Sequence, residues 1–365
     1  MKELDVEFDN NIKSLLYAIV YSYQESRSEE EVLSILEKIK RSKNILTPGQ
    51  WLEFSMYFLA MGFFQSSLMC RNFSYKQFDA KSKLNRVVYP FNYNTLNLAK
   101  LFDSGNLNEF QKEIQRLKGN NNKYWEAIFL NNYEKAKNDA PQLFEFINSK
   151  SIAIVGPLKF DDNYKKEIES HDIIVELNAL NSKREAVKNK YHAQPSIVTY
   201  NNYRIDCLKK QGFNDIIPNV KFHIVKRTKY LENLSKHGSV HVIPSTVTLN
   251  WNGSFSMMEN TVADLLLFNP KSIKIYGVDL FTSYDYDPSY GNPFPKQLAT
   301  ITLNFSVHDI FMNYMFMHNL FTKRLVSGDR RLENVLKMGI SNYTSKLKSV
   351  YPKMIGGQPI DVQNP

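Results

Sequence analysis

The feature that most constrains the fold is a series of short β-branched runs that starts at residue 151 and alternates with helix-length segments. The first run, 151–157, reads Ser-Ile-Ala-Ile-Val-Gly-Pro, and the second, 172–178, ends in Asn. Four similar runs follow, at 196–201, 220–225, 241–244 and 271–279. Strands separated by helical segments need crossover connections, which make the strands parallel. We therefore expect an α/β fold with a Rossmann-like parallel sheet within residues 151–365.

Residues 1–150 show the spacing of helices instead. Apolar residues recur at helical intervals over 15–23 and 29–39, and Thr47-Pro48 can start a further helix that runs through Met69. Three more helical segments are expected, at 96–102, 107–117 and 123–137. The sequence thus predicts an all-α N-terminal domain before the sheet. We expect this helical domain to bind an acceptor or a partner.

Composition and charge exclude several classes of protein. The net charge is +9, which indicates either solvated basic faces or a surface that meets anionic lipid or a nucleotide-linked substrate. No nucleic acid partner is expected. The two cysteines, Cys70 and Cys207, exclude a disulfide framework and a four-cysteine zinc site. The seven histidines are scattered without an H-E-x-x-H pattern, so we expect no metal.

The start of the chain is acidic and lacks the features of a secretory signal. The longest apolar stretch, 54–69, is short and interrupted by polar residues, so it predicts a buried helix and not a membrane span. We expect a cytoplasmic protein, with peripheral contact at the inner membrane face as the alternative for its basic surface.

The turn after the first predicted strand excludes two nucleotide-binding classes. Val155-Gly156-Pro157-Leu158-Lys159 has neither G-x-G-x-x-G nor a phosphate-binding lysine loop. A nicotinamide enzyme and a P-loop ATPase are therefore not expected.

Candidate ligand-binding residues lie at the predicted strand ends, because ligands of open parallel sheets bind outside the carboxyl ends of the strands. The residues there are Gly156, Pro157, Asn178, Asn201 and Asp279. Glycine lets a ligand approach the backbone, and asparagine offers a donor and an acceptor without charge. Turn formation is the alternative reading for the glycine and the asparagines.

Two further segments add hydroxyl groups and a histidine. Ser254 and Ser256 precede a predicted helix over 257–268, where they bind an anionic or hydroxylated ligand or only cap the helix. The loop 282–293 is either a lid or an inert surface loop, and its tyrosines are Tyr284, Tyr286 and Tyr290. His308 opens a predicted helix over 310–321, as a general base or as a cap.

Taken in order, these segments resemble the bacterial sialyltransferases that use CMP-linked sugars, together with transferases of other nonulosonic acids. The matching segments are Ile154-Val155-Gly156-Pro157, Asp172 to Asn178, Tyr200-Asn201, Ile275 to Phe281, Thr282-Ser283-Tyr284 and His308-Asp309-Ile310. The resemblance covers about residues 151–325. The family's G-x-G-P-S turn is here Ile154 to Leu158, and its Thr-Ser-Gly is replaced by a segment near Ser254 to Met257, so nucleotide contacts are expected to differ.

The resemblance implies a sialyltransferase-like variant of the GT-A fold and metal-independent transfer without a cofactor. A sialic or related nonulosonic acid would move from CMP to a hydroxyl of a bacterial surface glycan, glycolipid or protein. His308 would be the base, and the donor would be bound by Gly156, Pro157, Asn178, Asn201, Ser254, Ser256, Asp279, Tyr284, Tyr286 and Tyr290. For Asp279, acceptor binding and loop capping remain alternatives. The alternative functions are a transferase of the same fold with another nucleotide donor, and a non-catalytic helical scaffold.

Overall fold

The computed structural model describes most of the chain in separate ranges. These are residues 29–39, 46–80, 97–98, 100–101, 104–116, 128–159, 161, 163–182, 193–243, 255–283, 305 and 308–351. The predicted helix over 15–23 lies outside them.

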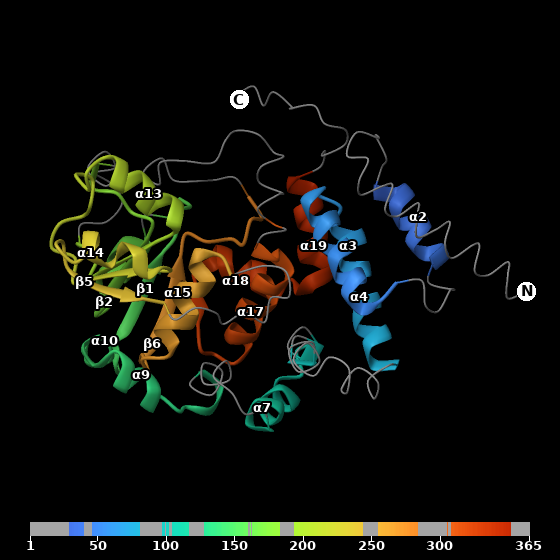
Figure 1. Ribbon diagram of the computed structural model, residues 1–365, viewed down its shortest axis with the longest axis horizontal. Coiled ribbons are helices and arrows are strands. Elements are labelled where there is room, and N and C mark those ends of the chain that lie inside the picture. Colours follow the sequence, from blue (N-terminus) through green and yellow to red (C-terminus); the bar gives the residue numbers. More distant parts are fainter. Residues whose placement is uncertain are drawn as a thin grey trace, which may run out of the picture.

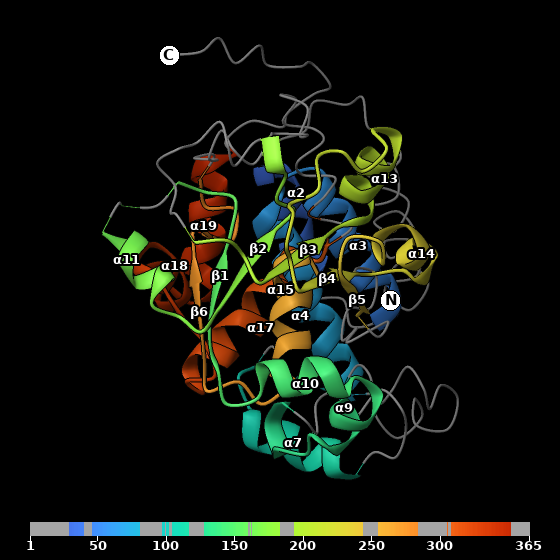
Figure 2. The same cartoon turned by 90° about the vertical axis from the view of Figure 1, so that its left-hand side faces the viewer.

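The centre of the fold is a seven-stranded sheet in the order β5-β4-β3-β2-β1-β6-β7, with every neighbouring pair parallel (Figure 2). Its strands are β1 (Ser151–Val155), β2 (Ile173–Leu177), β3 (Ile197–Tyr200), β4 (Phe222–Val225), β5 (Ser239–Val242), β6 (Ser272–Tyr276) and β7 (Ser327–Gly328). The predicted Rossmann-like α/β sheet and its six strands are confirmed. β7 was not expected, because Ser-Gly carries no β-branched pattern.

The order of the strands reverses beside β1. The chain adds β2 to β5 on one side of β1 and then crosses back to place β6 on the other side. Short helices follow β1, β3 and β4. They are α11 (Tyr164–Glu169), α13 (Asn202–Lys210) and α14 (Leu231–Leu234), the last preceded by the 3-10 turn Thr228–Tyr230. The return helix α15 (Met257–Leu266) packs in the core on the opposite face. Such a reversal is the position where open α/β sheets hold ligands.

One hydrophobic core joins this sheet face to helices from both ends of the chain. Side chains of β1 and β6, such as Ile154 and Ile275, share it with Leu59, Phe64 and Phe110 of the N-terminal region. The core also includes side chains of α10 (Pro141–Ile147), α17 (Ile310–Thr322), α18 (Arg330–Lys337) and α19 (Gly339–Val350), and α9 (Glu134–Asp139) packs against it. The predicted boundary near residue 150 coincides with the start of β1, but the core crosses it.

The N-terminal helices follow the predicted pattern with two differences. They are α2 (Glu29–Ile39), α3 (Pro48–Ala60), α4 (Phe64–Ala80) and α7 (Leu107–Arg116). The single helix expected through Met69 is wrong, because Gly62 adopts a φ of 75° and the N–H of Phe63 bonds the Phe58 carbonyl, which ends α3. The helix expected over 123–137 is interrupted at Asn131, with a φ of 55°. No helix among the described residues is long and apolar enough to cross a membrane.

A buried ion pair ties the N-terminal helices to α17. The Arg71 guanidinium on α4 donates to both carboxylate oxygens of Asp309, at 2.9 and 3.0 Å, and the two side chains are 3% and 2% exposed. Asp309 has a φ of 43° and caps α17 by accepting from the Met312 N–H at 3.2 Å. Figure 1 shows α3, α4 and α19 side by side, next to α17. The start of α17 therefore depends on a residue of the N-terminal helices.

We expect Arg71→Met to lower the free energy of unfolding by about 3–5 kcal/mol, because it leaves the buried Asp309 carboxylate without its cation. Urea denaturation measures the change. Lys112→Met is the matched control, since it removes the cation of an exposed pair with Glu109 at 2.7 Å and should cost less than about 1 kcal/mol. Equal effects of the two substitutions would contradict a structural role for the buried pair.

Candidate functional site

The loops that follow β1 and β6 pack directly against each other at the reversal point. The Gly156 N–H bonds the Tyr276 carbonyl at 2.8 Å, and the Leu158 N–H bonds the Gly277 carbonyl at 2.9 Å. A Cβ atom on Gly156 would lie 2.3 Å from Val278 Cγ2 and 2.5 Å from the Gly277 oxygen. The close approach that requires this glycine is thus made by the β6 loop. Contact of Gly156 and the half-buried Pro157 with a nucleotide stays a prediction.

The two candidate asparagines connect the ends of β2 and β3. Asn178 is buried with a φ of 54°, and its Oδ1 accepts from the Asn201 N–H at 2.8 Å. Asn201 caps α13, because its Oδ1 accepts from the Arg204 N–H at 2.7 Å. These carbonyl oxygens therefore have structural partners, and a ligand contact of either asparagine stays a prediction.

The start of α15 lies at this same edge of the sheet, where its two polar side chains meet a lysine that follows β4. Ser256 stands at the N-cap position, but its hydroxyl donates to the Glu259 carboxylate instead of capping the helix backbone. Burial raises the pKa of Glu259. Lys226, directly after β4, donates from Nζ to the Phe255 carbonyl at 3.2 Å, and burial lowers its pKa to about 8. Lys226 can therefore release a proton close to neutral pH.

The segment after β6 carries a buried carboxyl on a strained backbone. Asp279 is 4% exposed, burial raises its pKa, and the Ser283 hydroxyl donates to it. The next two residues, Leu280 and Phe281, have φ values of 51° and 69°, which non-glycine residues rarely adopt. The Tyr343 hydroxyl donates to the Leu280 carbonyl at 2.7 Å and holds this conformation. Strain of this kind gathers at functional sites.

The first turns of α17 supply a histidine and an asparagine. His308 is half-buried and immediately precedes Asp309. Asn313 lies one turn further along, where its N–H bonds the Asp309 carbonyl at 3.0 Å. Its side chain is 1% exposed, and neither Oδ1 nor Nδ2 has a hydrogen-bond partner among the residues that the structure describes. A buried carboxamide without partners loses the hydrogen bonds that it makes with water, which indicates a position that a polar ligand completes.

Ring contacts pack these elements against one another, and the pKa of Tyr343 reflects the nearby carboxylates. Phe255 and Phe316 pack with ring centroids 4.6 Å apart, which sets the start of α15 against α17. Asn313 precedes Phe316 by three residues, so the two share a helix face. On another side of α17, the Tyr314 and Tyr343 rings stack at 4.2 Å. Burial raises the pKa of Tyr343, and Glu259 and Asp279 raise it further.

The structure thus gathers part of the predicted site and adds residues to it. Ser256, Asp279 and His308 lie on elements that contact one another through α17 and α19, and Asn178 and Asn201 lie along the same edge. Ser254, Tyr284, Tyr286 and Tyr290 fall outside the described residues. Sequence reasoning missed Lys226, Glu259 and Asn313. Only Glu259 had a signal, since Ser256-Met-Met-Glu259 matches the capping-box spacing.

His241 on β5 is another histidine of the sheet, and it pairs with a carboxylate of α15. Its Nε2 lies 3.1 Å from Asp264 Oδ1, well along α15 from Ser256. Burial alone would lower the pKa of His241, but the charge and hydrogen bond of Asp264 outweigh it, so the pKa is raised. No group of acidic, histidine or cysteine side chains that could hold a metal occurs in the described ranges.

Comparisons of the chain with known proteins found no matching family model, no matching curated protein and no matching solved structure.

We expect Lys226→Met to stabilise the fold at pH 7 by about 1–3 kcal/mol, because it removes a buried ammonium group. The pKa of Lys226 is about 8 in the folded state, below the unfolded value near 10.5. The free energy of unfolding of the wild type therefore rises with pH between these two values. The difference in stability between wild type and variant should shrink over the same range. Urea denaturation at a series of pH values measures this change. Lys210→Met, at the exposed end of α13, is the control. If the difference in unfolding free energy between wild type and variant stays constant from pH 7 to 10, the lowered pKa of Lys226 is contradicted.

Proposed function

We propose that the chain is a metal-independent glycosyltransferase that moves a sialic or related nonulosonic acid from a CMP-linked donor to an acceptor hydroxyl. The ordered motifs of the sequence support the family, and the parallel sheet supports the general fold. The observation that carries a binding function is the carboxamide of Asn313, which is buried one turn beyond His308 and has no hydrogen-bond partner in the described part of the chain. Polar ligands such as a sugar or a nucleotide supply the missing donors and acceptors.

In this proposal, residues of the chain accept one proton and stabilise one leaving group. His308 accepts the acceptor hydroxyl proton while the acceptor oxygen bonds to the anomeric carbon. The bond from that carbon to the phosphate oxygen breaks, and CMP leaves with the electron pair. Lys226 and the first N–H groups of α15 favour the negative charge of the phosphate. Asp309, held by Arg71, fixes the backbone next to His308.

The nucleotide preference tests the donor class. CMP should raise the melting temperature, since a ligand that binds only the folded state stabilises it, and UDP and GDP should raise it less. A larger shift with UDP or GDP would favour a transferase of the same fold with another nucleotide donor.

Asn313→Leu is expected to change stability and binding in opposite directions. Loss of a buried, partnerless amide should raise the free energy of unfolding by about 1 kcal/mol, whereas the affinity for CMP or for the donor sugar should fall at least tenfold. Urea denaturation and calorimetry measure the two effects. Asn319→Leu, near the end of the same helix, is the control for substitution. Unchanged affinity for both CMP and a CMP-sugar would remove Asn313 from the site.

His308→Ala should lower the single-turnover rate of transfer by about 10²–10⁴, with CMP affinity nearly unchanged. His237→Ala, an exposed histidine before β5, should leave the rate unchanged. Quenched-flow analysis with a CMP-sugar measures the rate. A variant with lower stability and an unchanged rate would show that His308 only supports the helix.

A further inference from the structure

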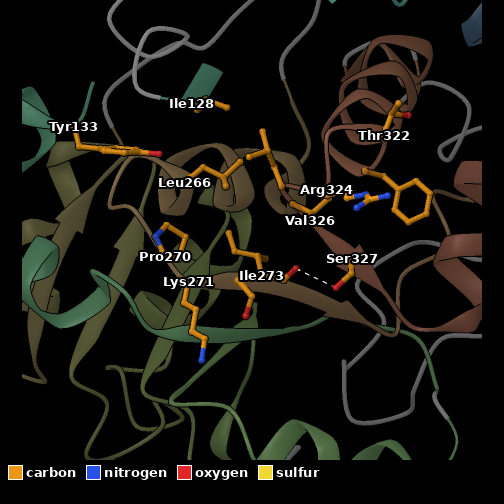
Figure 3. A pocket seen from close by; sticks show the side chains of 13 residues that line it. Ile128, Tyr133, Leu266, Pro270, Lys271, Ile273, Thr322, Arg324, Val326 and Ser327 are labelled. Carbon is orange, nitrogen blue, oxygen red and sulfur yellow. Dashed lines mark hydrogen bonds between the residues drawn. The ribbon is translucent and has the colours of Figure 1, made fainter. Parts of the chain in front are cut away.

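A cavity opens at the edge of the sheet opposite the candidate site, where the strands begin. It has a volume of about 640 Å³ and lies around the first residues of β6 and the last residues of α15 and α17. Figure 3 shows Leu266 and Val326 in its middle, with Tyr133 on one side and Arg324 on the other. A cavity of this size suits a small organic molecule.

The floor of the cavity is apolar. Leu266 and Ile273 are 6% and 1% exposed, and Val326 is 4% exposed. These three residues come from α15, β6 and the segment before β7, so the cavity is built from the rigid core and not from a surface loop. An apolar molecule placed there would be removed from water on several sides.

The rim carries positive charge. Its residues include Lys271 and Arg324, and no Asp or Glu lines the cavity among the described residues. Asp172 attracts Lys271, whose ammonium points away from the other labelled side chains in Figure 3. Arg324 is exposed and forms no ion pair within the part of the chain that the structure describes. Arg324 is therefore a cation that a ligand in the cavity can meet.

The backbone at Arg324 gives a second reason to assign it a role. The residue has a φ of 58° just after the end of α17, where the N–H of Leu325 bonds the Leu320 carbonyl at 2.9 Å. Helices that end in this way favour glycine at the left-handed position. An arginine there carries a conformational cost without an ion pair in return, as residues that serve a ligand often do.

We infer that this cavity, defined by Tyr133, Leu266, Ile273, Arg324 and Val326, is a binding site for a small amphipathic anion, with an apolar body on the floor and a carboxylate, sulfonate or phosphate head at Arg324. This cavity is separate from the candidate functional site at the carboxyl ends of the strands, here called the carboxyl-edge site. α15, α17 and β6 each run from the cavity to the carboxyl-edge site. A ligand in the cavity would therefore fix the ends of these elements that lie opposite Ser256, Asp309 and Asp279.

The test uses the full chain with the fluorescent anion 1-anilinonaphthalene-8-sulfonate, and with decanoate as competitor. We expect saturable binding at one site, displacement by decanoate, and at least tenfold weaker displacement by decanol, which lacks the charge. Arg324→Gly should weaken binding at least tenfold without lowering the melting temperature, because glycine suits the left-handed backbone. Lys323→Gly, the exposed neighbour that does not line the cavity, should weaken binding less than twofold.

Three outcomes would overturn the inference. Equal affinity in the Arg324→Gly variant would remove the proposed head-group contact. Displacement by inorganic phosphate at the decanoate concentration would show that the apolar floor contributes nothing. Displacement by CMP would place the probe in the carboxyl-edge site. Because the readout is binding of the probe, failure of the glycosyltransferase proposal would leave the result unaffected.

Discussion

The structure depends on the buried ion pair between Arg71 and Asp309. Two charges that are almost fully removed from water stay ionised only when each compensates the other, and here both Asp309 oxygens accept from one guanidinium nitrogen. Asp309 also caps α17 and itself adopts a left-handed backbone next to His308. One interaction therefore joins the N-terminal helices, the central helix and the candidate base.

Around that helix, the carboxyl edge of the sheet concentrates groups that are costly to bury. Lys226, Glu259 and Asp279 all have pKa values shifted by burial, and Asn313 has no hydrogen-bond partner within the described ranges. Two consecutive residues, Leu280 and Phe281, hold strained backbone at the same edge. The opposite edge is apolar with a basic rim. This division explains why we assign polar chemistry to one edge and an amphipathic ligand to the other.

The sequence predicted the elements well where local patterns decide them. The helix expected over 29–39 matches α2, and the β-branched runs located six strands, because both signals come from neighbouring residues. Arg71 and Asp309 are 238 positions apart, and no local pattern pairs them. Asn313 looks like an ordinary helix residue until its surroundings are known. Gly156 was singled out as a residue that lets a nucleotide approach; the structure shows that its backbone lies close to Val278 and Gly277, which no local pattern indicated, and the nucleotide contact stays a prediction.

A crystal structure of the chain with CMP tests the central claim most directly, since the claim concerns where a nucleotide lies. The account predicts CMP over the carboxyl ends of the strands, near the start of α15, with a polar atom of the ligand within hydrogen-bond distance of the Asn313 carboxamide. CMP bound elsewhere, with the Asn313 side chain still buried and without a partner, would contradict it.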